Sequence, residues 1–121
     1  MILVGRYGSP YGRRIAVTRR LTGIPYERRT IAAWDDFDAV TSVNPVGRVP
    51  ALILDDGEVI VESIFITDAL DQITGPERAL TPPAGPERPR VQQLVALAMG
   101  TLDKMAMVVY WVRNRTLKML V

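Results

Sequence analysis

The chain has 121 residues, of which 48% are apolar and 23% are charged, so it fits one soluble domain or one domain and the start of another. This composition excludes a disordered or fibrous protein. The absence of cysteine and histidine excludes a disulfide framework, thiolate or imidazole metal sites, and a catalytic or redox thiol supplied by the protein itself.

The first third of the chain predicts a strand, a helix and a second strand. Residues 1–7 are apolar and β-prone, and they end in a Gly-Ser-Pro turn at residues 8–10. A helix is expected over residues 12–22, because Gly23 is a residue type favoured where helices end and Pro25 prevents continuation. Residues 26–31 alternate well enough to form the second strand.

The middle of the chain predicts a hairpin followed by a helix. A short irregular helix is expected over residues 34–40. Strands at residues 51–54 and 58–61 flank Asp-Asp-Gly, which is a hairpin signal that makes the two strands antiparallel. The next helix follows Glu62 and Ser63 and ends near Gly75. Its apolar residues recur at helical spacing, and they are Ile66, Ala69, Leu70 and Ile73.

The rest of the chain predicts a linker and one long amphipathic helix. Residues 76–89 contain five prolines, so no regular element is expected there. We therefore expect a domain at residues 1–75, a linker at 76–89, and a helix at 90–121. The fold class is α/β, with helices on both faces of a mixed four-stranded sheet.

Charge and hydropathy bear on partners and location. Residues 1–31 carry seven arginines and one glutamate, which can meet phosphates but is also typical of a solvated helix face. We expect no nucleic-acid partner. The N-terminus does not resemble a signal peptide, which favours a cytoplasmic location. The apolar run at residues 94–112 is interrupted by Asp103 and Lys104, so no membrane-spanning helix and no membrane partner are expected.

Several candidate site residues also have ordinary structural interpretations. Ser9 is placed to cap the first helix, and Ser63 to cap the third. Tyr7 is also a candidate core aromatic residue. Arg48 can be a solvated loop residue, and Pro50 fits the first position of a strand.

Four motifs together resemble the glutathione transferase family, most closely its bacterial members. They are SPYGRR at residues 9–14, NPVGRVPAL at 44–52, ES at 62–63 and AMGTLD at 98–103. The resemblance covers residues 1 to about 113. It implies a thioredoxin-like βαβαββα domain with a mixed four-stranded sheet, followed by the start of an all-helical domain that is truncated at residue 121.

The resemblance also implies roles for individual residues. Ser9, or in its place Tyr7, would stabilise the thiolate of glutathione, the expected co-substrate. A cis bond before Pro50 would turn the Val49 backbone toward the cysteinyl part of glutathione, and Arg48 would pair with its glycyl carboxylate. Ser63 would bind the γ-glutamyl carboxylate and Glu62 the γ-glutamyl ammonium. No metal is expected.

The resulting hypothesis is a detoxifying glutathione transferase that activates the thiol for conjugation to a small electrophile, and that forms a homodimer. One alternative is a non-catalytic glutathione-binding or protein-interaction module of the same fold. A glutaredoxin-like oxidoreductase is a third hypothesis, which the absence of cysteine opposes. Many relatives carry an acid where this chain has Met99, which puts an ammonium contact from that helix in doubt.

Overall fold

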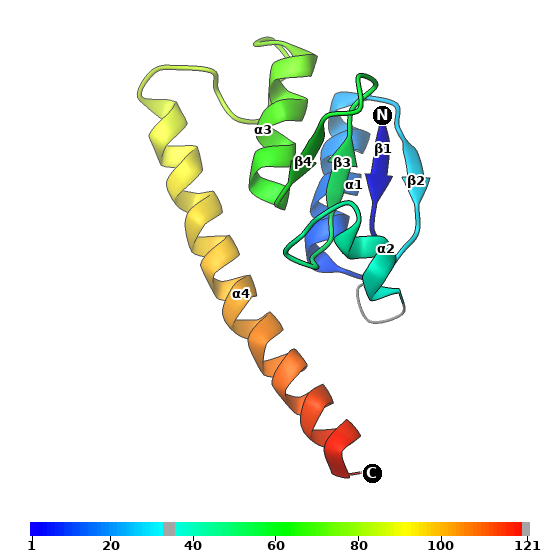
Figure 1. Cartoon of the computed structure of the whole chain (residues 1–121). Coiled ribbons are helices and arrows are strands. Elements are labelled where there is room, and N and C mark those ends of the chain that lie inside the picture. Colours follow the sequence, from blue (N-terminus) through cyan, green and yellow to red (C-terminus); the bar gives the residue numbers. More distant parts are fainter. Residues whose placement is uncertain (33–35, 120–121) are drawn as a thin grey trace. The chain divides into compact units, whose positions relative to one another are not determined.

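The computed structural model describes residues 1–32 and 36–119. The chain divides into two compact units, at residues 1–83 and 84–121. The first unit has the predicted βαβαββα order of elements (Figure 1). The second unit contains a single helix within its described part.

The sheet has the strand order β2-β1-β3-β4. Its strands are β1 (Ile2–Val4), β2 (Glu27–Arg29), β3 (Ala51–Ile53) and β4 (Val59–Val61). β1 is parallel to β2 and antiparallel to β3, and β3 is antiparallel to β4, so the predicted mixed sheet and hairpin are confirmed. β2 and β4 are the two edge strands.

The helices of the first unit are α1 (Pro10–Thr22), α2 (Phe37–Thr41) and α3 (Ser63–Thr74). α1 begins two residues before the predicted start, because proline fits the first turn of a helix. α2 begins where the Asp36 side chain accepts a hydrogen bond from the Ala39 N–H at 3.0 Å. Part of the helix predicted at 34–40, including Trp34, lies outside the described residues.

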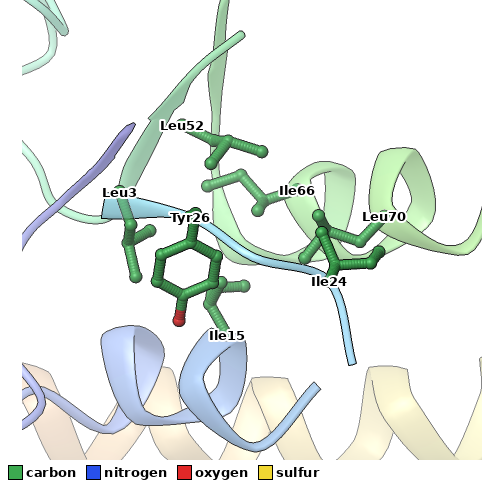
Figure 2. Packing of buried hydrophobic residues seen from close by; sticks show 7 residues of the cluster. All are labelled: Leu3, Ile15, Ile24, Tyr26, Leu52, Ile66 and Leu70. Carbon is green, nitrogen blue, oxygen red and sulfur yellow. The ribbon is translucent and has the colours of Figure 1, made fainter. Parts of the chain in front are cut away.

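The hydrophobic core lies between the sheet and the pair α1 and α3. Leu3 is paired with Leu52, so their side chains point to the same face of the sheet, where both are fully buried. Figure 2 shows these side chains converging with Ile15 of α1 and with Ile66 and Leu70 of α3. α1 and α3 are therefore packed beside one another on this face of the sheet.

Residues one step along the same strands, Val4 and Ala51, point to the opposite face and are also buried. In Figure 1, α2 lies in front of the strands and α1 behind them, so helices occupy both faces as predicted. Ile73, which was part of the predicted apolar stripe of α3, is instead 52% exposed.

α4 (Glu87–Met119) begins within the segment predicted as linker, which had been expected to reach residue 89. Within the described residues, α4 is the one helix long and apolar enough to cross a membrane, with an 18-residue window of mean hydropathy 1.4. Core helices of soluble proteins can have the same length and apolar composition. The exclusion of a membrane-spanning helix on the basis of Asp103 and Lys104 was therefore too strong.

Candidate functional site

Ser9 lies at the N-terminus of α1, and its hydroxyl makes no capping hydrogen bond there. It is the N-cap residue by position, with an extended backbone, and its carbonyl accepts a hydrogen bond from the Arg13 N–H at 2.8 Å. Its side chain makes no capping hydrogen bond, so the interpretation of Ser9 as a side-chain cap is wrong. The half-buried hydroxyl is left beside the first N–H groups of α1, where the helix dipole favours negative charge.

The hydroxyl of Tyr7 is engaged elsewhere. Its oxygen lies 3.4 Å from the hydroxyl oxygen of Tyr26, and its ring packs against the core. The Arg28 guanidinium lies over the Tyr7 ring, 4.4 Å from the ring centroid. Burial raises the pKa of Tyr26, and the hydrogen bond with Tyr7 raises it further. Tyr7 is therefore a partly buried aromatic residue whose phenol is paired with another phenol.

The loop before β3 is organised by Asn44, which is 1% exposed. The Asn44 side-chain amide donates to the Arg48 carbonyl at 2.9 Å, and its oxygen accepts from the Val46 N–H at 3.0 Å. Gly47 has a φ of +71°, and a side chain there would lie 2.6 Å from the Phe37 ring, so the position requires glycine. The buried Asn44 side chain thus holds the loop by two hydrogen bonds, and the Phe37 ring lies against Gly47.

This loop presents Arg48 and Val49 at the start of β3. The Val49-Pro50 peptide bond is cis, as expected from the resemblance. Nη1 of Arg48 lies 3.9 Å from Oε1 of Glu62, and the two side chains are 71% and 46% exposed. An ion pair this open to solvent contributes little to stability, so either partner can exchange it for a ligand.

The β4–α3 junction carries Glu62 and Ser63. Glu62 is the N-cap by position, with a φ of 66°, and is the one non-glycine residue with positive φ in the described chain. Such conformations cost of order 1–3 kcal/mol and are often retained at ligand sites. Ser63 is the first helical residue and is 2% exposed, so the prediction that Ser63 caps α3 is wrong.

Arg14 of α1 brings the two helix starts together. Its Nη1 donates to Oγ of Ser63 at 3.5 Å, across the contact between α1 and α3. Burial lowers the pKa of Arg14, and the negative charge of Asp71 acts in the opposite direction. Because Arg14 lies in the first two turns of α1 and Ser63 is the first residue of α3, the N-terminal parts of the two helices lie close together.

The structure therefore connects some predicted residues directly and leaves others separate. Arg48 contacts Glu62, and Arg14 contacts Ser63. No hydrogen bond joins Ser9 to Glu62 or Ser63 within the described chain. Sequence reasoning missed the contacts of Asn44 and Arg14. Asn44 belongs to the motif at residues 44–52 and Arg14 to the motif at residues 9–14, so membership in these motifs was the sequence signal that could have identified both residues.

A family model described as "Glutathione S-transferase, N-terminal domain" matches residues 3–78. The chain belongs to the glutathione S-transferase family. The expected thioredoxin-like domain with a helical C-terminal part is confirmed by solved glutathione transferase structures of the same fold.

Relatives of this transferase family include bacterial and plant proteins. The uncharacterised GST-like protein YibF of Escherichia coli (strain K12) is 31% identical over 103 residues, which cover 85% of this chain and 50% of YibF. Glutathione S-transferase U9 of Arabidopsis thaliana is 32% identical over 72 residues, which cover 60% of this chain and 30% of U9. The chain thus spans about half or less of these curated relatives.

Two solved structures extend the comparison. A glutathione transferase family member from Pseudomonas fluorescens Pf-5, with bound glutathione, has a TM-score of 0.77 and 33% identity, covering 88% of this chain and 54% of its own. A glutathione S-transferase from Methylobacillus flagellatus KT, also with glutathione bound, has a TM-score of 0.78 and 30% identity, covering 87% and 52%.

Proposed function

We propose that the chain binds glutathione and activates its thiol for conjugation to a small electrophile. The single observation that carries the proposal is the half-buried Ser9 hydroxyl at the N-terminus of α1, which makes no capping hydrogen bond in that helix. A free thiol with a pKa of about 8.5 is only a few per cent thiolate at neutral pH, and the thiolate is the nucleophile. One charge-assisted hydrogen bond together with the helix N-terminus can supply the roughly 2.7 kcal/mol that lowers this pKa by two units.

The start of α3 supplies a subsite for the γ-glutamyl end. Because Arg14 donates to the Ser63 oxygen, the Ser63 proton is available for a ligand carboxylate. The free N–H groups of the first turn add donors, and the Arg14 charge favours an anion. Glu62, held in its unusual backbone conformation beside Ser63, would accept from the ammonium group.

Arg48 and Val49 would meet the rest of the tripeptide. The Val49 backbone at the cis bond would pair with the cysteinyl unit in a strand-like manner. Arg48 would leave the carboxylate of Glu62 and pair with the glycyl carboxylate of glutathione. Breaking the Arg48–Glu62 ion pair costs little free energy, because both side chains are open to solvent.

Changing Glu62→Ala and Ser63→Ala together is expected to weaken glutathione binding at least tenfold, because both groups that recognise the γ-glutamyl end are removed. Isothermal titration calorimetry measures this effect. Asp68→Asn, a charge removal elsewhere on α3, is the matched control and should bind like the wild type. An unchanged affinity in the double variant would rule out this site assignment.

A non-catalytic glutathione-binding or interaction module is the second candidate function. This function needs only the contacts of Glu62, Ser63 and Arg48 with glutathione and makes no use of the Ser9 hydroxyl. In that case glutathione would bind with its thiol pKa unchanged.

We also propose that the protein associates with a second copy. Taken by itself, the second unit contains a single helix in its described part, so its apolar side chains have no other helix in that unit to pack against. Sedimentation at several concentrations should therefore show a dimer. A compact monomer at all concentrations would contradict this.

The proposed glutathione transferase function includes a cytoplasmic location and a detoxification role, because glutathione is the thiol pool of the cytosol.

A further inference from the structure

Asp71 of α3 is a buried acid, 6% exposed, whose carboxylate binds a distant segment of the chain. Oδ1 accepts from the Leu80 N–H at 2.8 Å, and Oδ2 accepts from the Thr81 N–H at 3.0 Å. A buried carboxylate is strongly unfavourable unless such donors or an opposite charge compensate it. The two N–H groups therefore hold residues 80 and 81 against α3.

The same segment is also attached to α1. Nη1 of Arg78 donates to the Thr22 carbonyl at 3.4 Å. Residues 78–81 thus contact both helices that carry the candidate site, and they belong to the unit that ends at residue 83. This segment was predicted to be a linker without regular structure, and its docking was not foreseen.

Asp71 also interacts electrostatically with Arg14: its negative charge raises the pKa of that guanidinium, against the effect of burial, and Arg14 donates to Ser63 at 3.5 Å. While residues 80 and 81 are docked, their N–H groups fix the Asp71 carboxylate, whose negative charge attracts the Arg14 guanidinium and helps to hold it at Ser63. When residues 80 and 81 detach, the carboxylate loses the two donors that fix its position, so Arg14 loses the charge that positions it at Ser63.

We propose that Asp71 is a positioning residue that couples the carboxylate subsite at Ser63 to the docking of residues 80 and 81. The inference rests on the proposed function, since the subsite is that of the γ-glutamyl carboxylate. Coupling between two sites is reciprocal, so docking of residues 80 and 81 strengthens glutathione binding, and glutathione stabilises their docking.

The test measures amide hydrogen exchange at Leu80 and Thr81 together with glutathione affinity. In the wild type, saturating glutathione should slow exchange at these two amides by about fivefold. Asp71→Asn should weaken glutathione binding by about fivefold and abolish this protection. Asp68→Asn neutralises an acid on the same helix and should change neither quantity.

A ligand variant separates positioning from general damage to the fold. A glutathione analogue lacking the γ-glutamyl carboxylate should bind the wild type and Asp71→Asn equally, because it makes no use of the positioned groups. If Asp71→Asn weakens both ligands equally, Asp71 acts only as a structural anchor and the inference is wrong.

Arg14→Met provides a second route that leaves the bonds from Asp71 to residues 80 and 81 in place. It should weaken glutathione binding and remove the protection of the Leu80 and Thr81 amides by the ligand. Glutathione binding by the wild type without protection of these amides overturns the coupling alone. No binding by the wild type overturns the proposed function and the coupling together.

Discussion

Replacing Ser9 by alanine is expected to raise the pKa of the bound glutathione thiol by about one to two units. The loss of one charge-assisted hydrogen bond is worth about 1.5 to 3 kcal/mol, which corresponds to this shift. The hydroxyl that is removed makes no capping bond in α1, so the fold should change little. Titration of the thiolate ultraviolet absorbance against pH measures the shift directly.

Tyr7→Phe is the matched control for this experiment. Its hydroxyl is paired with Tyr26, and its ring is held by the core and by Arg28, so removing the oxygen should leave the thiol pKa nearly unchanged. A large shift in Tyr7→Phe with none in Ser9→Ala would refute the serine assignment. No shift in either variant would favour binding without activation.

Replacing Asn44 by alanine is expected to destabilise the first unit by about 1–3 kcal/mol. The substitution removes two part-buried hydrogen bonds of the Asn44 side chain, to the Val46 N–H and the Arg48 carbonyl, and each such bond contributes about 0.5–1.5 kcal/mol. Chemical denaturation followed by the amide signals of β1 and β3 measures the free energy of unfolding for this unit.

Ser42→Ala is the control for Asn44→Ala. The Ser42 hydroxyl also donates to a backbone carbonyl, that of Ala39 at 2.8 Å, but the bond is exposed to water. Its loss should cost less than about 1 kcal/mol. Equal effects of the two substitutions would mean that burial of Asn44 does not matter. Because Asn44 holds the loop that presents Arg48, glutathione affinity should fall in Asn44→Ala and stay constant in Ser42→Ala.

Elements with a strong local cause were predictable from the sequence. The helical spacing of Ile66 and Leu70 located α3, and Gly57 located the β3–β4 hairpin. Boundaries were less accurate because hydrogen bonds set them. β1 ends at Val4 rather than residue 7, since Gly5, with a φ of +137°, leaves the strand conformation. β2 covers Glu27–Arg29 rather than residues 26–31.

Contacts between distant residues were not predictable in the same way. Arg14 and Ser63, which share a hydrogen bond, are 49 positions apart. Asp71 accepts a hydrogen bond from the Leu80 N–H, and Leu80 lies in a proline-rich segment that was predicted to have no regular structure. Asp71 follows Leu70 and had the sequence pattern of an ordinary helix-surface acid. Its carboxylate instead accepts hydrogen bonds from the Leu80 and Thr81 N–H groups, a docking of the chain that no local pattern encodes. Similarly, composition cannot distinguish a cis from a trans bond at Pro50.

The two edges of the sheet differ in their resistance to aggregation. An edge strand exposes unpaired backbone N–H and C=O groups to any other strand that can pair with them, and charged side chains oppose such pairing. β2 consists of one glutamate and two arginines, all exposed, so the approach of a second copy at that edge brings arginines together. β4 consists of Val59, Ile60 and Val61, none of them charged and none fully buried. Self-association by strand addition is therefore disfavoured at β2 and should begin at β4, where a single lysine in place of Val59 would block it.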